Sequence, residues 1–321
     1  MYHSFAGAVC AGAVLLTTSS APAQNLFEAD LNSGNIYEFT LGGVKSTFAS
    51  GFSYPIGLAI NSVGDLFVAN EFSGIITKIT PGGVKSTFAS GLSPWGLAFN
   101  SAGDLFEADF NSGNIYEFTP GGVKSTFASG LSYPIELAFN SAGDLFEADF
   151  GSDSIYKFTP GGVKSTFASG LNGPEGLAVD SAGDLFEADH GSGKIYEFTP
   201  SGTRSTFASG LSGPCALAFN SAGDLFEADH GSGKIYEFTL GGTRSTFASG
   251  LNGPEELAFQ SEILPVPEPS AFGMLAVGAA ALLVLDPRSG NARPRGLPVP
   301  KRLYTNCSNS HQLKACKADR K

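Results

Sequence analysis

Carboxyl side chains recur in this chain at a fixed spacing, and they are the residues best placed to do chemistry. A glutamate fills the centre of a repeated Leu-Phe-Glu-Ala-Asp string at Glu28, Glu107, Glu147, Glu187 and Glu227. If these carboxylates converged, their mutual repulsion and loss of hydration would raise their pKa values or demand a cation such as Ca²⁺. On that hypothesis the candidate metal ligands are Glu107, Glu147, Glu187 and Glu227. The interpretation we favour is that they are solvated, or paired with basic side chains such as Lys124 or Arg204, and no cofactor is then expected.

Two further sets of polar residues have simpler explanations than catalysis. The aspartates that end each string most often bond nearby backbone amides when they follow a strand; they are Asp30, Asp109, Asp149, Asp189 and Asp229. His190 and His230 stand at one position of two copies that continue identically with Gly-Ser-Gly-Lys, so duplication explains them better than metal ligation. The chain contains no His-Glu-x-x-His motif, nucleophile elbow or phosphate-binding loop. A catalytic function is therefore not the favoured prediction.

The strings belong to a repeat of 39 or 40 residues, counted between the leucines that open them. A period in this range is typical of solenoids, propellers and other arrays. In the copy that starts at Gly96, four strand-like runs cover residues 96–99, 104–109, 115–119 and 124–129. Glycine-containing turns of the hairpin type separate the first two runs and the last two. Four antiparallel strands in each repeat predict the blade of a β-propeller.

The two ends of the repeat region are complementary. Six sets of second, third and fourth strands are present, but the first set lacks its first strand, and an additional first-type run, Glu256 to Phe259, follows the last set. That run can complete the first blade and remove the open edges of the ring. We therefore predict an all-β fold: a six-bladed propeller of four-stranded antiparallel blades over residues 24–260, closed by its C-terminal strand.

Differences between the copies are concentrated in two kinds of connection, one from the second to the third strand and the other from the fourth strand to the next repeat. In an antiparallel blade both kinds emerge on the same side of the disc, which we call the variable face. Loops on a rigid scaffold are where recognition usually occurs, and aromatic rings can stack on sugars or anchor a peptide. The candidate ligand-binding residues on this face are Tyr54, Phe72, Trp95, Phe110, Tyr133, Phe150, Glu175, His190, His230 and Glu255. Drift among recently duplicated copies is the alternative explanation.

Charge and cysteine content exclude other classes. The net charge of −11 is opposite to the basic footprint that nucleic-acid binding needs. Only Cys215 lies in the repeats, so a disulfide framework does not hold this fold.

The repeat also resembles a known family. The stretch Pro174-Glu-Gly-Leu-Ala-Val-Asp-Ser-Ala-Gly-Asp-Leu-Phe-Glu-Ala-Asp, followed by Gly193-Lys-Ile-Tyr-Glu-Phe, is similar to the NHL repeat and to gluconolactonase-like propellers. The family usually has an apolar residue at the centre of the second strand. Val68 keeps that pattern, and the five glutamates depart from it. The resemblance implies a metal-dependent hydrolase or a streptogramin lyase as the alternative function, although neither activity can be placed on specific residues.

The two ends of the chain predict its export. Residues 1–23 have the apolar run and the Ala21-Pro-Ala23 cleavage site of a signal peptide. A linker over 261–270 contains Pro267, Glu268 and Pro269, an apolar helix is predicted over 271–285, and a basic, polar, disordered tail is predicted over 286–321. The motif, the helix and Arg288, Arg293 and Arg295 together resemble the PEP-CTERM sorting signal, with Asp286-Pro287 as a departure from it.

This second resemblance implies an exosortase-type processing enzyme and a Gram-negative bacterium that makes exopolysaccharide. The expectation is a non-catalytic binding scaffold, anchored in the membrane only transiently and only through the C-terminal helix. It is then secreted or held at the cell surface or in the extracellular matrix, where it binds polysaccharide or a surface protein.

Overall fold

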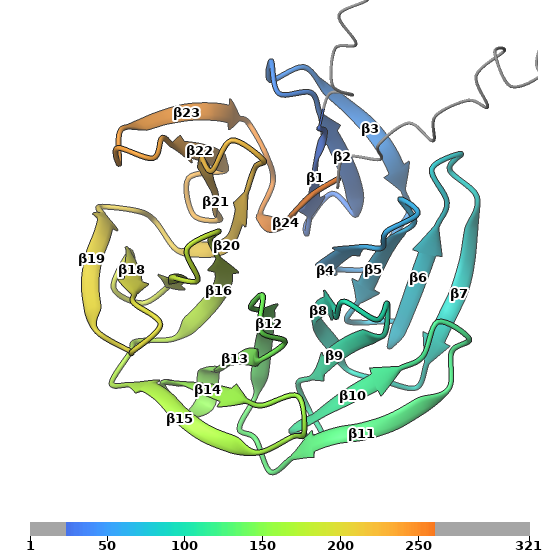
Figure 1. The fold of residues 1–321 in the computed structure, drawn as a ribbon. Helices are drawn as coiled ribbons and strands as arrows, with labels where there is room; N and C mark the ends of the chain where they lie inside the picture. Colours follow the sequence, from blue (N-terminus) through green and yellow to red (C-terminus); the bar gives the residue numbers. More distant parts are fainter. Residues whose placement is uncertain (1–23, 261–321) are drawn as a thin grey trace, which may run out of the picture. The chain divides into compact units, whose positions relative to one another are not determined.

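The computed structural model describes residues 24–260, which form one ring of six four-stranded antiparallel sheets (Figure 1). Blade 1 contains β24 (Pro254–Phe259), β1 (Leu26–Asp30), β2 (Asn35–Phe39) and β3 (Lys45–Ser50); blade 2 contains β4 (Pro55–Ile60), β5 (Leu66–Asn70), β6 (Ile75–Ile79) and β7 (Lys85–Ser90). Blade 3 contains β8 (Pro94–Phe99), β9 (Leu105–Asp109), β10 (Asn114–Phe118) and β11 (Lys124–Ser129); blade 4 contains β12 (Pro134–Phe139), β13 (Leu145–Asp149), β14 (Ser154–Phe158) and β15 (Lys164–Ser169). Blade 5 contains β16 (Pro174–Val179), β17 (Leu185–Asp189), β18 (Lys194–Phe198) and β19 (Arg204–Ser209); blade 6 contains β20 (Pro214–Phe219), β21 (Leu225–Asp229), β22 (Lys234–Phe238) and β23 (Arg244–Ser249). A short 3-10 helix, η1 (Phe150–Ser152), is the one helical element of this described region.

The predicted six-bladed, all-β architecture is confirmed, with small shifts in strand limits. In blade 3 the innermost strand begins at Pro94 rather than at Gly96. Proline is tolerated as the first residue of a strand, because its missing N–H is not needed there. The second and third strands cover Leu105–Asp109 and Asn114–Phe118, each limit within one residue of the prediction.

Closure of the ring also occurs as predicted. The C-terminal strand β24 pairs antiparallel with β1, with Leu26 opposite Phe259 and Glu28 opposite Leu257. Blade 1 is therefore assembled from both ends of the repeat region. This pairing leaves the ring without the open edges that would otherwise invite aggregation.

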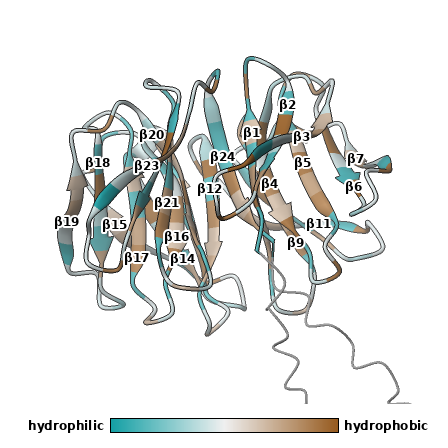
Figure 2. Ribbon diagram, turned by 90° about the horizontal axis from the view of Figure 1, so that it is seen from above, coloured by the Kyte–Doolittle hydropathy of each residue, from teal (hydrophilic) through white to brown (hydrophobic). Residues whose placement is uncertain are grey.

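The core lies between neighbouring blades rather than inside any one of them. In every blade the second strand is buried along its whole length, because a neighbouring blade covers each of its faces. A phenylalanine cluster recurs at these interfaces; between blades 5 and 6, Phe186 makes edge-to-face contacts with Phe207 and Phe219, each with ring centroids 5.1 Å apart. Figure 2 shows apolar colour along the strands and polar colour toward many of the turns. Such edge-to-face geometry is favourable for aromatic pairs.

The signal peptide (1–23), the linker with its Pro-Glu-Pro motif (261–270), the apolar helix (271–285) and the tail (286–321) were all predicted for segments outside the described residues. Among residues 24–260, no helix is long and apolar enough to cross a membrane.

Candidate binding face and central channel

The two variable kinds of connection do lie together on one face of the ring. Backbone hydrogen bonds join them: Phe110 N donates to the Ser93 carbonyl (3.0 Å), and His190 N donates to the Gly173 carbonyl (3.1 Å). In five of the six blades an aspartate ends the second strand and reinforces this junction, whereas blade 2 has Asn70 there. In blade 3, Asp109 accepts from Ser112 N (3.0 Å) and from Ser93 N (2.8 Å), and so clamps both loops at once. This confirms the prediction that these aspartates bond backbone amides.

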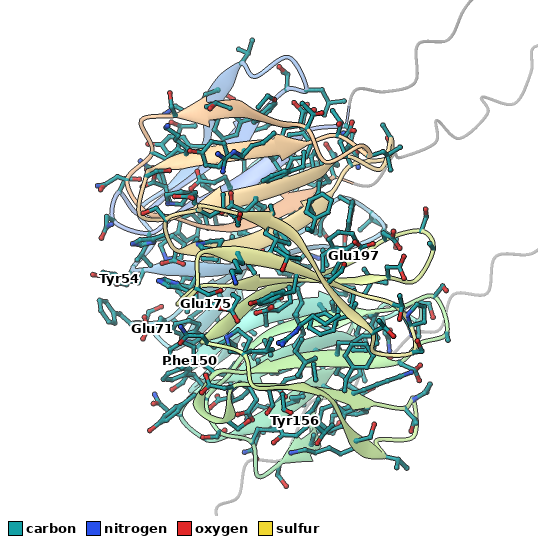
Figure 3. All side chains as sticks on the ribbon, turned by 90° about the vertical axis from the view of Figure 1, so that its left-hand side faces the viewer. Tyr54, Glu71, Phe150, Tyr156, Glu175 and Glu197 are labelled. Carbon is teal, nitrogen blue, oxygen red and sulfur yellow. The ribbon has the colours of Figure 1, made fainter. Side chains whose placement is uncertain are left out.

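The aromatic candidates lie on blades 2, 3 and 4, and five of them form two groups of contacting rings. The rings of Tyr54 and Phe72 lie 4.0 Å apart, and Phe110 lies 4.8 Å from both Trp95 and Tyr133. The Trp95 and Phe110 rings are stacked, with an angle of 17° between them. Phe72 is 65% exposed, Tyr133 50% and Phe150 40%. In Figure 3, Tyr54 and Phe150 lie on one edge of the disc, with Glu71 and Glu175 along the same edge. We call these six rings the aromatic band: Tyr54, Phe72, Trp95, Phe110, Tyr133 and Phe150.

Two tyrosines of the band have an unfavourable backbone conformation. Tyr54 and Tyr133 both have φ of 57°, in the left-handed region. In blades 5 and 6 the same position is occupied by Gly173 and Gly213, with φ of 66° and 69°. A side chain in this region costs of order 1 kcal/mol or more, and such strain is concentrated at functional sites.

The other half of the variable face carries charge. His190 Nδ1 lies 2.9 Å from a Glu175 carboxylate oxygen, and His230 Nδ1 lies 3.0 Å from one of Glu255. The hydrogen bond to glutamate raises the pKa of each histidine, while burial raises the pKa of Glu175. The ten sequence candidates thus divide into an aromatic half and a half with two His–Glu pairs. No group of three or more His, Cys, Asp or Glu side chains among residues 24–260 is arranged to hold a metal ion.

A pair of glutamates at the centre of the ring was missed in the sequence analysis. Glu136 lies on β12 of blade 4 and Glu256 on β24 of blade 1, and these strands face each other across the centre of the ring (Figure 1). Each side chain accepts a hydrogen bond from the backbone N–H of the following leucine, at 2.9 Å and 2.8 Å. Burial raises the pKa of Glu136 to about 7, and burial together with the neighbouring Glu136 carboxyl raises that of Glu256 well above its usual value. The two buried carboxyl groups therefore interact across opposite blades.

The sequence does contain a signal for this pair. The corresponding inner-strand position is glycine in blades 2, 3 and 5, where a side chain would collide with the next blade: a Cβ at Gly57 would overlap the Trp95 carbonyl oxygen, and one at Gly96 the Ile135 carbonyl oxygen. Glutamate occupies this crowded position only in blades 4 and 1, three repeats apart. In a ring of six, that spacing places the two side chains opposite each other.

The five glutamates at the centres of the second strands are neither solvated nor paired, and the favoured prediction for them was wrong. Each is 0% exposed, and neither carboxylate oxygen of any of them has a hydrogen-bond partner. Lys124 and Arg204 lie over the rings of Tyr116 and Tyr196 instead, 4.0 Å and 4.9 Å from the ring centroids. The prediction fails because both faces of the second strand are covered, so none of its side chains reaches water.

Burial changes the protonation of these carboxyl groups. Loss of hydration, followed by repulsion from the aspartate two residues on, raises the pKa of Glu107, Glu187 and Glu227 to about 9. The same causes raise the pKa of Glu28 and Glu147 well above the usual value. Each group lies on a second strand, between the first and third strands of its own sheet, and no three of the carboxyls in the described part of the chain converge into the carboxylate ring considered above. Glu107 lies between Leu97 and Tyr116 in the sheet, and Val68 fills the same position of blade 2.

Comparison with known proteins places the fold in a recognised class. No family model matches the chain, and no curated protein does. Among solved structures, a chain of a nidogen–laminin complex aligns with 75% of this chain and 100% of its own length, at 20% identity and a TM-score of 0.69. An inactive variant of virginiamycin B lyase from Staphylococcus aureus, solved with quinupristin, aligns with 74% of this chain and 97% of its own, at 18% identity and a TM-score of 0.58. A protein described as a putative gluconolactonase aligns with 67% and 88%, at 14% identity and a TM-score of 0.59.

These similarities define the class of protein by fold. The chain is a six-bladed β-propeller whose structural neighbours include a chain of a nidogen–laminin complex, a streptogramin B lyase and a putative gluconolactonase. Both binding proteins and enzymes are among them, so the fold alone does not assign an activity.

Proposed function

We propose that this protein is a non-catalytic binding scaffold that recognises an extracellular polysaccharide through the aromatic band of its variable face. The observation that carries the proposal is the set of partly exposed rings on three blades, in which Phe110 stacks on Trp95 and also contacts the tilted ring of Tyr133. Flat aromatic faces suit the apolar faces of sugar rings. The strained Tyr54 and Tyr133 support the proposal further, because a strained backbone is retained where the side chain has a use.

Replacing Tyr133 by glycine tests the band without damaging the fold. The variant Tyr133→Gly places glycine at φ 57°, as in blades 5 and 6, so the melting temperature should stay constant or rise slightly. Binding should weaken by about tenfold or more, because a stacked ring at the centre of an interface contributes about 2 kcal/mol. We would measure affinity by calorimetry, using exopolysaccharide purified from the producing bacterium as the probe. Phe72→Ala, which removes a ring that is 65% exposed, should weaken binding in the same way.

The matched control is Val123→Ser, which changes another highly exposed apolar side chain, 68% exposed in the turn between β10 and β11, away from the band. It should leave affinity unchanged. Equal affinities for all three variants would contradict a role for the band. If the chain bound protein from the cell surface but no polysaccharide, the band would be a protein-binding site.

We propose further that the protein is exported by its N-terminal signal and sorted by an exosortase-type enzyme that recognises Pro267, Glu268 and Pro269. The support comes from the order of the C-terminal segments, in which the Pro-Glu-Pro motif precedes the apolar run and the arginines. On this proposal the protein is anchored transiently in the membrane and then released to the cell surface or extracellular matrix.

Deletion of residues 267–269 tests the sorting step. The deletion should leave an uncleaved chain of higher mass in the membrane fraction, because the processing enzyme has lost its recognition motif. Immunoblotting of membrane, surface and medium fractions measures this, with deletion of residues 308–310 as the control. An unchanged mass and an unchanged location after deletion of 267–269 would overturn the sorting proposal while leaving the binding proposal intact.

A metal-dependent propeller enzyme, of the gluconolactonase or streptogramin lyase kind, is the alternative function. Its support is the likeness of fold, and no specific arrangement of side chains in this chain favours it over binding.

A further inference from the structure

The face opposite the variable face carries cavities between the blades, and one of them is large. The cavity between blades 5 and 6 has a volume of about 630 Å³, in the range of small-molecule and side-chain binding pockets. Its apolar wall is made of four phenylalanines from the two blades, and its acidic groups are Asp180 and Glu197. Leu240, which is 79% exposed, forms part of the rim. Figure 3 shows Glu197 away from the edge that carries Tyr54 and Phe150.

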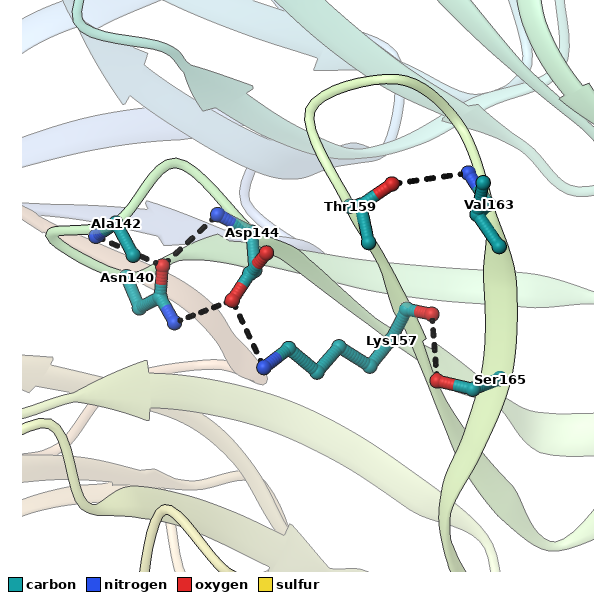
Figure 4. Close-up of polar contacts among 7 residues, drawn as sticks. All are labelled: Asn140, Ala142, Asp144, Lys157, Thr159, Val163 and Ser165. Carbon is teal, nitrogen blue, oxygen red and sulfur yellow. Dashed lines mark hydrogen bonds and ion pairs between the residues drawn. The ribbon is translucent and has the colours of Figure 1, made fainter.

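In two other blades a lysine side chain lies beside the equivalent phenylalanine. In blade 4, Lys157 is the cross-strand partner of Phe146, and its Nζ lies 2.8 Å from an Asp144 carboxylate oxygen (Figure 4). The same Nζ lies 5.6 Å from the Phe146 ring centroid. In blade 2, Lys78 pairs in the same way with Asp65 at 2.6 Å and lies 5.9 Å from the Phe67 ring centroid. An ammonium group in each case satisfies a carboxylate and faces an aromatic ring.

In the other four blades the same strand position carries a glutamate; these residues are Glu38, Glu117, Glu197 and Glu237. Glu117 is the cross-strand partner of Phe106, and Glu197 is the partner of Phe186. In blades 3 and 5 a carboxylate therefore replaces the internal ammonium. Glu117 accepts a hydrogen bond from Ser125 Oγ (3.5 Å) and Glu197 one from Ser205 Oγ (3.4 Å), and no ion pair within residues 24–260 neutralises either glutamate. Blade 5 is the more acidic of the two, because Asp180 stands in its turn where blade 3 has Asn100.

Three cavities on this face differ in size and in the charge of the side chain that lines them. The cavity between blades 2 and 3, which Lys78 lines, has a volume of about 190 Å³. The cavity lined by Glu117, between blades 3 and 4, measures about 380 Å³, and the one lined by Glu197 measures about 630 Å³. The cavities lined by Glu117 and Glu197 thus leave room beside the ring, together with negative charge that no ion pair in the described part of the chain neutralises.

We propose that the cavity between blades 5 and 6 binds a lysine side chain from an extended segment of a partner protein. The ammonium group would lie near Glu197 and Phe186, as the Lys157 ammonium lies near Asp144 and Phe146, and the methylene stem would pack on the phenylalanine wall. Charge complementarity favours a basic partner, since residues 24–260 carry 26 acidic and 10 basic side chains. This site is independent of the aromatic band and lies on the other face.

The test uses an Ala-Lys-Ala-Lys-Ala peptide blocked at both ends, titrated into the purified protein by calorimetry. The variant Glu197→Lys recreates the internal pair of blade 4, because Asp184 occupies the place of Asp144. It should fold, since the chain already contains this arrangement twice, and it should weaken peptide binding at least tenfold. Glu197→Gln removes the charge without adding a side chain that fills the cavity, and we expect an intermediate loss. The same peptide with Nε-acetylated lysines should lose affinity as strongly as Glu197→Lys, because it lacks the ammonium.

A control must separate the effect of net charge on peptide binding from the effect of the site itself. Glu71→Lys makes the same charge change on the variable face and should reduce affinity less than about threefold at physiological salt. Equal losses for Glu71→Lys and Glu197→Lys, or equal binding of the acetylated peptide, would overturn the proposal. If spermidine bound tightly through Glu197 while the peptide did not, a polyamine would be the ligand and a protein lysine would be excluded.

Discussion

Replacing Glu107 by valine is expected to stabilise the protein by about 3 kcal/mol at pH 7. The wild-type carboxyl group is fully buried without a hydrogen-bond partner, and its pKa is raised to about 9 from an ordinary value of 4.5. At pH 7 the unfolded chain ionises this group while the folded chain keeps it protonated, and each pH unit of that difference costs about 1.4 kcal/mol. Valine removes the penalty and already fills the same position in blade 2, where Val68 is fully buried.

The sign of the pH dependence follows from the raised pKa. Below pH 4.5 the glutamate is protonated in both states, so its contribution to stability is fully present there. As the pH rises from 4.5 toward 9, the unfolded state loses the proton first and stability falls. The pKa values of Glu28, Glu147, Glu187 and Glu227 are raised in the same direction. The melting temperature of the wild-type protein should therefore be highest near pH 4 to 5 and should fall steadily toward pH 9.

Urea unfolding of the wild-type protein and of Glu107→Val between pH 4.5 and pH 8.5 measures both effects. The stability difference should be small at the acid end and grow with pH. Glu237→Val is the control, because Glu237 is a half-exposed strand residue and its replacement should change stability by less than about 0.5 kcal/mol. Parallel pH profiles for the wild-type protein and Glu107→Val would show that Glu107 is ionised in the folded state and would refute the prediction.

The second large effect is expected at the centre of the ring. Glu136→Gln should stabilise the protein by about 3 kcal/mol at pH 8 and by little at pH 4.5. In the wild-type protein, burial keeps a proton on this pair of opposite carboxyls, and the unfolded chain releases that proton as the pH rises above 4.5. An amide at position 136 donates to Glu256 without needing that proton, so this part of the stability loss disappears.

Combined variants identify the origin of this effect. Glu136→Gln and Glu256→Gln alter the same contact between two side chains, so their stability changes should not add in the double variant. Glu136→Gln and Glu107→Val alter separate layers of the ring, and their changes should add within about 0.5 kcal/mol. Additive behaviour of the Glu136 and Glu256 variants would mean that the two carboxyls do not interact across the centre.

The two effects have a common physical basis. A propeller packs its blades face to face, so carboxyl groups at the centre of a second strand or an inner strand have little access to water. We expect these variants to identify the acidic residues that limit stability at neutral pH, and the half-exposed ones, such as Glu237, to matter little.

The sequence by itself determined the architecture of this protein. The repeat period, the turn glycines and the complementary ends predicted six blades and their closure through β24, because these features depend on local turn chemistry and on the order of strands along the chain. It also predicted the backbone bonds of aspartates such as Asp109, and the face that gathers the aromatic band, since antiparallel strands send alternate connections to the same side.

Only the tertiary structure decided which carboxyl groups are in water. Glu107 follows a phenylalanine in its strand, and Glu197 precedes one in its strand. Glu107 is nevertheless fully buried, whereas Glu197 lines a cavity, because the packing of blade against blade covers the first position and leaves the second open. The contact between Glu136 and Glu256 required the ring to close, since 120 residues separate them along the chain. Burial and contact across the ring depend on distances through space, which the local pattern of a repeat does not contain.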